Sequence, residues 1–348
     1  MPHCIINPFR GQGLAGAEQF PSQNADAVAK LLAFCPAHGE TPLICVPDLA
    51  QQAGVAGLWI KDERARMGLG SFKALGAAYC IAHDAAETVP EDWSKALIGR
   101  TYATASAGNH GMSVAAGARV FGARAVIYLA QTVPEAFAER LRVQGAEVVR
   151  AGDDYEASMD AARQDADTND WNLLSDSTWL GTTGPGYRVM EGYLQMVAEA
   201  AAQIPEPPTH ILLQAGVGGL AAAVATYARK VWGDAPQIIV VEPEFAPALI
   251  ESIRAGALVD TTGPVSEMGR LDCKTASLVA LNGLARDADL FVTISEEEAG
   301  QAVSTLADVG LHSTPSGAAG VAALLAGIDG IGSDARVLCF LSEGPEDG

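Results

Sequence analysis

The sequence predicts an α/β protein in which helices flank mostly parallel sheets. Short apolar runs alternate along the chain with helical patterns of about 10–15 residues, which is the order that βαβ units produce. Glycine and alanine are abundant while aromatic residues make up only 6%, which suits helices packed closely on a parallel sheet. The 348 residues are 49% hydrophobic, so the chain can bury a substantial core, and its length fits two domains or one large α/β unit with an insertion.

Residues 1–40 are expected to form an irregular lead-in that includes a short helix at 25–33. Beyond residue 57 the two patterns alternate, and the helix at 72–83 is assigned from apolar residues that recur at spacings of three and four. The strands are predicted at 58–61, 101–103, 125–129 and 147–151, and the further helices at 111–121, 134–143 and 155–169.

The alternation resumes after a proline-rich stretch at 204–208. Strands are predicted at 210–214, 238–242, 290–294 and 337–342, and helices at 219–231, at 296–308 and after Gly317. Ligands of open α/β sheets bind outside the carboxyl ends of the strands. The loops that follow these strands are therefore where a functional site is expected.

Charge and composition exclude several classes of partner. The formal net charge of −20 repels nucleic acid and anionic membrane surfaces, which bind through Lys and Arg. No apolar run reaches the roughly 18 residues of a membrane span, and residues 1–10 lack the order of a signal peptide. The six cysteines include no CxxC pair, so they are expected to be thiols in a reducing compartment and not zinc ligands. We expect a cytoplasmic protein.

The segment Gly70-Ser71-Phe72-Lys73 carries the first chemical signal. Lys73 falls at the start of a predicted helix, between apolar neighbours. Partial burial favours the neutral amine, which can form a Schiff base with a carbonyl compound. Taken alone, the segment also fits an ordinary lysine that reaches solvent from the start of a helix.

The second signal is the stretch 106–111 (SAGNHG), which lies between a predicted strand and a predicted helix. Its small residues allow a ligand to approach the backbone, and its N–H groups can point at an anion near the helix N-terminus. Ser106 and Asn109 add side-chain hydrogen-bonding groups. In isolation the stretch is equally consistent with an ordinary βα turn.

The third signal is the glycine-rich stretch 214–220 (QAGVGGL), again between a strand and a helix. Successive N–H groups and the helix dipole at such a loop can hold a phosphate dianion. Gly216, Gly218 and Ala221 also match a dinucleotide fingerprint, and Glu242 ends the next strand, where a ribose partner would lie. An NAD-binding dehydrogenase therefore remains an alternative, although that class has no need of the two upstream segments.

A lysine, an asparagine loop and a glycine loop in this order resemble the fold-type II, tryptophan-synthase-β-like family of pyridoxal-phosphate (PLP) enzymes, from about Thr41 to the C-terminus. The resemblance implies two domains with parallel-rich sheets, a large PLP-binding domain of residues 1–75 plus 185–348 and a smaller mobile domain of residues 76–184. It implies a homodimer. Cofactor contacts are implied for Lys73, Phe72, Asn109, Gly216, Val217, Gly218, Gly219, Leu220 and Ser342, with Lys73 bonded to PLP, Asn109 at the ring hydroxyl and Ser342 at the ring nitrogen.

Within that family the sequence is similar to diaminopropionate ammonia-lyases. The similar stretches are residues 59–64 (WIKDER), 68–76 (GLGSFKALG), 176–179 (DSTW), 186–187 (GY), 190–193 (MEGY) and 342–344 (SEG). The similarity implies β-elimination from a small β-substituted amino acid such as 2,3-diaminopropionate, giving a 2-oxo acid and ammonia. Lys73 is then the general base and Asp176 the candidate proton donor. The substrate would bind at Ser106, Ala107, Gly108, Asn109 and His110, with His110 more suited to supporting its loop than to moving protons.

Two departures from the lyases keep other reactions open. The lyases carry Asp at the position of Ala107, whereas serine and threonine dehydratases have alanine there, as this sequence does. Residues 313–317 (STPSG) replace the usual glycine- and glutamate-containing motif of the lyases. The alternatives are a serine or threonine dehydratase, a β-replacing synthase of the cysteine-synthase kind, and a PLP-binding module without catalysis. Whether Cys273 contacts the site is left open.

No metal site is expected. Related serine racemases bind a divalent cation just after the strand that follows the phosphate loop. The corresponding segment here keeps Glu242 but has Ala248 where a second carboxylate would be needed. We therefore expect Glu242 to be a solvated residue at a strand end.

Overall fold

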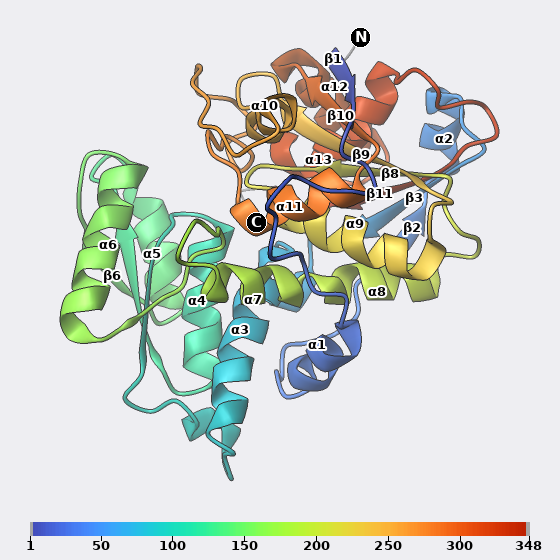
Figure 1. Cartoon of the computed structure of the whole chain (residues 1–348). Helices are drawn as coiled ribbons and strands as arrows, with labels where there is room; N and C mark the ends of the chain where they lie inside the picture. Colours follow the sequence, from blue (N-terminus) through green and yellow to red (C-terminus); the bar gives the residue numbers. More distant parts are fainter. Residues whose placement is uncertain (1–2, 346–348) are drawn as a thin grey trace.

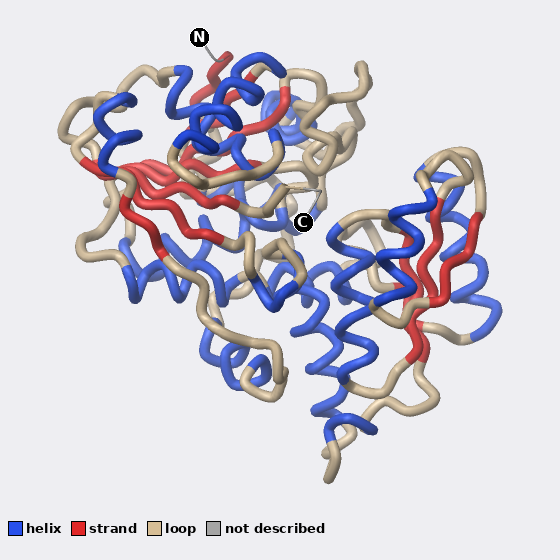
Figure 2. The backbone as a smooth tube through the Cα atoms, turned by 180° about the vertical axis from the view of Figure 1, so that it is seen from behind, coloured by secondary structure: helices blue, strands red, loops and turns tan. Residues whose placement is uncertain are grey.

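The computed structural model describes residues 3–345 and contains two separate sheets, each flanked by helices (Figures 1 and 2). The larger sheet has the strand order β1-β10-β9-β8-β11-β3-β2. Its inner strands pair in parallel, while the edge strands β1 and β2 run antiparallel to their neighbours. The strands are β1 His3–Ile6, β2 Leu43–Cys45, β3 Gly57–Asp62, β8 His210–Gln214, β9 Gln237–Pro243, β10 Leu290–Ile294 and β11 Arg336–Leu341.

The smaller sheet is all parallel and has the order β6-β5-β4-β7. It forms a second lobe beside the first, seen at the left of Figure 1. Its strands are β4 Thr101–Ala105, β5 Arg124–Leu129, β6 Glu147–Arg150 and β7 Asn172–Leu173. The predicted fold class, two parallel-rich sheets flanked by helices, is confirmed.

Helices cover both faces of the larger sheet, which is why the middle residues of its central strands are apolar on both sides. In β9, Ile238 and Val240 face one buried cluster, while Ile239 and Val241 face another on the opposite side. The helices are α1 Ala25–Leu32, α2 Pro47–Ala53, α3 Lys73–Glu87, α4 Asn109–Val120, α5 Glu135–Val143, α6 Tyr155–Asn169, α7 Gly184–Gly192, α8 Leu194–Gln203, α9 Gly219–Trp232, α10 Ala248–Ala255, α11 Leu278–Asp287, α12 Glu296–Asp308 and α13 Pro315–Ala326. None of the helices in the described range 3–345 is long and apolar enough to cross a membrane.

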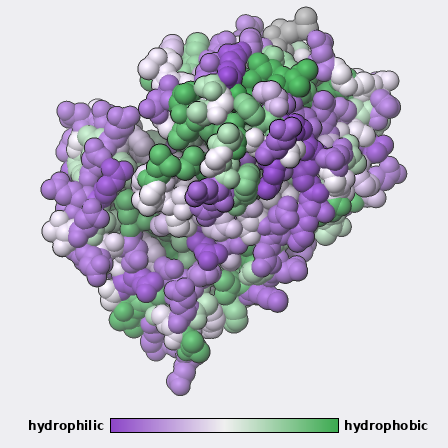
Figure 3. Space-filling model, in the orientation of Figure 1, coloured by the Kyte–Doolittle hydropathy of each residue, from purple (hydrophilic) through white to green (hydrophobic). Residues whose placement is uncertain are grey.

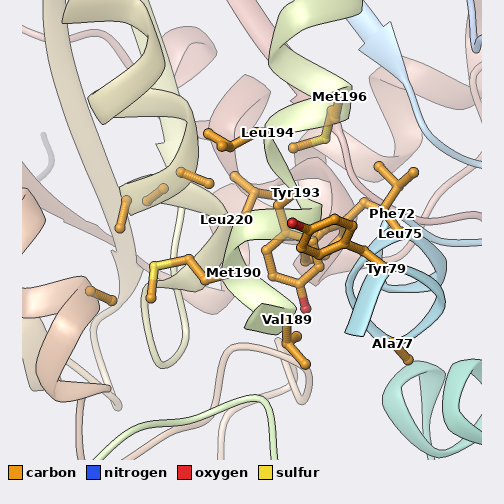
Figure 4. Close-up of a cluster of buried hydrophobic side chains, with 14 of the residues drawn as sticks. Phe72, Leu75, Ala77, Tyr79, Val189, Met190, Tyr193, Leu194, Met196 and Leu220 are labelled. Carbon is orange, nitrogen blue, oxygen red and sulfur yellow. The ribbon is translucent and has the colours of Figure 1, made fainter. Parts of the chain in front are cut away.

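The two lobes are joined by a close crossing of α3 and α7, part of which is drawn in Figure 4. A Cβ atom at Gly76 would lie 2.6 Å from the Tyr193 ring, and one at Gly192 would lie 2.7 Å from the Leu75 carbonyl oxygen. Both distances are shorter than any real Cβ contact, so each position requires glycine. This crossing fixes α3, and with it the lysine at its first position.

The main difference from the sequence prediction is at the N-terminus. Residues 1–40 were expected to hold no strand, but His3–Ile6 pairs antiparallel with β10 at the edge of the larger sheet. Most of this strand is exposed, so it lacks the apolar alternation by which a strand is recognised. The surface in Figure 3 mixes polar and apolar residues, with hydrophobic residues gathered over the larger lobe.

The predicted domain division separates the strands as the two sheets do. All strands of the smaller sheet fall within residues 76–184, and all strands of the larger sheet fall outside them. The boundary between residues 75 and 76 falls inside α3. The exact division and the mobility of the smaller lobe stay predictions.

Candidate active site

The site forms where loops at the ends of several strands meet. Lys73 opens α3, and the N–H of the preceding Phe72 donates to the Ser342 carbonyl oxygen at 3.0 Å, just after β11. Asn109 opens α4 after β4, and the glycine loop lies between β8 and α9. The structure thus brings together segments that are more than 200 residues apart in sequence. In each sheet the parallel strands end at a common edge, and the site lies where loops from that edge of the larger sheet (after β3, β8 and β11) meet loops from that edge of the smaller sheet (after β4 and β7).

Lys73 forms an ion pair with Asp176, which lies in the loop after β7. The side chains are 22% and 17% exposed, so the pair is mostly withdrawn from water but open on one side. Burial lowers the pKa of the Lys73 amine, but the Asp176 carboxylate outweighs this effect and places that pKa above the ordinary value. In turn, burial raises the pKa of Asp176, and the charge of Lys73 outweighs it and places that pKa below the ordinary value. The resting pair is an ammonium facing a carboxylate.

Asn109 is held by a carboxylate that sequence reasoning did not identify. Its side-chain amide donates to Glu343, and the Thr314 hydroxyl donates to the other carboxylate oxygen of Glu343. Glu343 is 4% exposed and also pairs through its backbone with Ser71, two residues before Lys73. Its neighbourhood therefore links the asparagine loop to the lysine segment. The only signal in the sequence was its place in the SEG ending.

The glycine loop has the form of an anion cradle. Gly218 adopts φ +98°, a left-handed conformation that favours glycine, and it caps the N-terminus of α9. A Cβ atom at Gly216 would lie 3.0 Å from the Cys273 sulfur, so that position is also tightly confined. The first N–H groups of α9 and the helix dipole favour a phosphate there. Cys273 therefore lies against the loop, and burial raises the pKa of its thiol to about 11, which keeps it protonated.

His110 supports the asparagine loop. It is buried, and its Nε2 lies 2.9 Å from the Leu174 carbonyl oxygen. Burial lowers the pKa of His110, so the ring is neutral near pH 7 and Nε2 donates to that carbonyl. Gly108 is in contact with Arg270, because a Cβ atom there would lie 2.7 Å from the guanidinium. The predicted substrate loop is thus fixed from both sides.

A cavity of about 550 Å³ opens between the lobes next to Asn109. Its walls come from both lobes, with Met112 and Arg140 on one side and Gly70, Arg270 and Glu343 on the other. A volume of this size accommodates a small ligand. It gives a route from solvent to the asparagine loop.

Comparisons with known proteins decide the family. The family model described as "Pyridoxal-phosphate dependent enzyme" matches residues 34–343, most of the chain. The chain belongs to the pyridoxal-phosphate dependent enzyme family. Among curated proteins it is 33% identical over 307 residues to the diaminopropionate ammonia-lyase of Escherichia coli strain K12, covering 82% of this chain and 77% of that one. It is 29% identical over 278 residues to the human L-serine dehydratase/L-threonine deaminase, covering 78% of each chain.

Solved structures agree with this assignment. The E. coli diaminopropionate ammonia-lyase in complex with an aminoacrylate-PLP azomethine reaction intermediate superposes with a TM-score of 0.88 at 28% identity, covering 100% of this chain and 94% of that one. The same enzyme in complex with D-serine gives a TM-score of 0.89, again at 28% identity. The predicted family and the predicted cofactor, PLP, are confirmed, and the choice between PLP and a nicotinamide nucleotide is decided for PLP.

The residues present fit PLP. The site holds an amine that can bond to the aldehyde (Lys73), an amide side chain (Asn109) and a glycine loop suited to the phosphate. Lys73, Asn109 and residues 216–220 are the groups that would hold the cofactor. Ser342 is buried at the end of β11 beside Phe72, consistent with the predicted place at the ring nitrogen. The individual roles of these residues stay predictions.

The prediction for Glu242 was wrong. This side chain is fully buried, and it accepts hydrogen bonds from the backbone N–H groups of Leu249 at 2.7 Å and Ile250 at 2.8 Å, at the start of α10. The sequence shows Glu242 at the end of a strand but not that a helix returns over it. Leu249 also lies 3.2 Å from where a Cβ atom of Gly218 would be, so Glu242 anchors a helix that packs against the glycine loop.

Burial raises the pKa of Glu242 to about 8, against a small opposing effect of its two N–H donors. The folded protein therefore binds a proton more tightly here than the unfolded chain does. Stability from this group is fully present below the unfolded pKa near 4.5 and is lost as the pH rises toward 8. We expect the free energy of unfolding, measured by urea denaturation, to fall less steeply between about pH 5 and pH 8 in Glu242→Gln than in wild type. Equal slopes in the two proteins would contradict this.

Proposed function

We propose that the protein is a PLP-dependent β-elimination lyase for a small amino acid with a β-amino group, with 2,3-diaminopropionate as the first candidate. The observation that supports the proposal is the Lys73–Asp176 ion pair, an amine and a carboxylate that can exchange a proton. The relatives named diaminopropionate ammonia-lyase support the choice of substrate. The products would be a 2-oxo acid and ammonia.

When bound, PLP supplies the electron sink that stabilises negative charge at the substrate Cα. Lys73, released by the incoming substrate amine, takes the proton from Cα as general base. The bond between Cβ and nitrogen then breaks, and its electron pair leaves with the nitrogen. Asp176, a carboxylate in the resting pair, accepts the proton that Lys73 has taken and passes it to that nitrogen, so ammonia departs as a neutral molecule.

The hydrogen bond between Lys73 and Asp176 returns the site to its starting state. Because the proton taken from Cα passes along this bond and on to the leaving group, Asp176 ends as the carboxylate that it was at the start and Lys73 ends as a neutral amine. The remaining three-carbon product reacts with one water to give the 2-oxo acid and a second ammonia. Lys73 thus serves as cofactor anchor and base, and Asp176 as proton donor.

The substrate carboxylate is placed at the asparagine loop, over Ser106, Ala107 and Asn109. Backbone N–H groups at the start of α4 point toward an anion there, and the helix dipole favours negative charge. Arg270, in contact with Gly108, adds positive charge next to this loop. A carboxylate on the substrate is therefore stabilised from two directions.

A serine or threonine dehydratase is the second candidate. Ala107 favours it, since the position lacks the acidic side chain that the resemblance to the lyases predicts. The human serine dehydratase relative supports it further. The leaving group would then be hydroxide, which Asp176 would protonate in the same position. A β-replacing synthase remains a third possibility that requires a second substrate.

We also propose that the protein works as a cytoplasmic homodimer. Its six cysteines are free thiols, which suits a reducing compartment. Hydrophobic residues gather over the larger lobe in Figure 3, and the exposed apolar side chains include Ile6 and Val265. Light scattering on a size-exclusion column checks this, and a monomer at micromolar concentration would contradict it.

The first experiment is a visible absorbance spectrum of PLP-loaded protein with each candidate substrate. We expect the band of lysine-bound PLP to change on addition of D- or L-2,3-diaminopropionate, with release of a 2-oxo acid and ammonia in a ratio of one to two. Serine releases ammonia and 2-oxo acid in equal amounts, so the ratio identifies the substrate. Turnover of serine or threonine with none of diaminopropionate would overturn the first proposal and favour the dehydratase.

A further inference from the structure

Tyr193 lies in the buried cluster of Figure 4, together with Phe72 and Leu75 near the start of α3 and Leu220 near the start of α9. It lies between α7 and α8 and is 2% exposed. Its ring packs against Phe72 with the ring centroids 4.8 Å apart. One ring edge lies 2.6 Å from where a Cβ atom of Gly76 would be, and the other lies 3.4 Å from the corresponding position at Gly219. The ring is therefore held between the first turn of α3 and the first residue of α9.

The hydroxyl of Tyr193 is buried and makes no hydrogen bond within residues 3–345. A buried hydroxyl without a partner costs free energy, so few proteins retain one without a reason. Tyr79 in the same buried cluster shows the usual arrangement, since its hydroxyl donates to Glu191 at 3.1 Å. The unpaired hydroxyl of Tyr193 therefore indicates a contact with an atom of a ligand.

The surroundings of Tyr193 indicate which kind of ligand atom its hydroxyl would contact. The two ring carbons that flank the hydroxyl, Cε1 and Cε2, lie 2.6 Å and 3.4 Å from where Cβ atoms of Gly76 and Gly219 would be. The hydroxyl therefore lies between the first turn of α3 and the first residue of α9, and a phosphate would sit at the start of α9. Lys73 directly follows Phe72 in the chain, and its charge is close enough to the Tyr193 phenol to affect the pKa of that phenol. Burial raises the pKa of Tyr193, so the hydroxyl stays protonated and can donate. A fixed, neutral donor at this point suits a phosphate dianion.

We propose that the Tyr193 hydroxyl donates a hydrogen bond to the phosphate group of bound PLP. The glycine loop supplies backbone donors, and Tyr193 adds a side-chain donor from the junction of α7 and α8. The proposal depends on PLP binding and not on which amino acid is the substrate. It therefore stands or falls separately from the proposed function.

The test compares two forms of the cofactor on the apoprotein, PLP and pyridoxal, which lacks the phosphate. In Tyr193→Phe we expect the dissociation constant of PLP to rise about 10- to 100-fold, since a hydrogen bond to a charged group is lost. The dissociation constant of pyridoxal is expected to stay within about twofold of wild type, because pyridoxal lacks the charged phosphate that accepts the hydrogen bond. Absorbance titration of apoprotein measures both.

The matched control is Tyr79→Phe, a buried tyrosine on α3 whose hydroxyl has a protein partner. We expect its ratio of PLP to pyridoxal affinity to equal that of wild type. Apo Tyr193→Phe is expected to unfold at the same temperature as wild type or higher, since it loses an unpaired buried hydroxyl. If it does not fold, Tyr193→Met, which also packs without a hydroxyl, replaces it. Unchanged PLP affinity, or equal weakening of PLP and pyridoxal, overturns the proposal.

Discussion

Lys73→Ala is expected to lower the rate of β-elimination by about 10⁴-fold and to remove the visible absorbance band of lysine-bound PLP. In the proposed mechanism the substitution deletes both the amine that bonds to the cofactor and the base at the substrate Cα. It also leaves Asp176 mostly buried without its cation, so stability near pH 7 should fall as well. Absorbance of PLP-saturated protein and a 2-oxo acid assay measure the first two effects, and urea denaturation measures the third.

Lys230→Ala is the matched control for Lys73→Ala. Lys230 lies at the far end of α9, where its amine donates to the Gln23 carbonyl oxygen at 2.9 Å. We expect this variant to keep the visible band and the activity of wild type. A Lys73→Ala protein that keeps its band and its turnover would refute the assignment of the cofactor lysine.

Asp176→Asn is expected to lower the turnover of diaminopropionate by about 10²- to 10⁴-fold, and the loss should depend on the leaving group. An amine leaves only with a proton, whereas the chloride of β-chloroalanine leaves without one. The amide cannot supply that proton, so β-chloroalanine should lose much less activity. The ratio of the two rates, measured in wild type and variant, isolates proton donation from any effect on cofactor position.

The same variant has a second readout in the apoprotein. Burial lowers the pKa of Lys73 and Asp176 raises it, so removing the carboxylate should lower that pKa. Lys73 in Asp176→Asn should therefore bond to added PLP at a lower pH than in wild type. Asp165→Asn, which alters an aspartate that accepts from Tyr128 on the outer side of the smaller lobe, is the control. Equal loss for both substrates would contradict the role of Asp176 as acid.

Much of the fold could be predicted from the sequence because its signals are local. Strands such as β8 and β9 are apolar on both faces, and helices such as α6 and α12 begin at side-chain caps, Asp154 and Ser295. The edge strand β1 was missed for the opposite reason, since it is mostly exposed and gains its order only by pairing with β10. Its existence depends on a partner almost 290 residues away.

In the candidate site, too, the residues placed by local signals could be predicted and the contacts made by tertiary packing could not. Lys73, Asn109 and the glycine loop are recognisable because each is placed by its own helix N-terminus. The contacts between Lys73 and Asp176, and between Asn109 and Glu343, join residues 103 and 234 positions apart and follow only from the packing of the lobes. The burial of Glu242 under α10 is a tertiary effect of the same kind.

The crossing of Gly76 and Gly192 limits how this site can diversify. A single methyl group at either glycine would force the backbones of α3 and α7 apart and tilt the helix that begins with Lys73. The position of the Lys73 amine relative to the glycine loop thus depends on the absence of a side chain at both glycines. Even the smallest larger residue, alanine, is not tolerated at either position. New substrate preferences must therefore arise in loops such as those of Ala107 and Thr314, while the crossing stays unchanged.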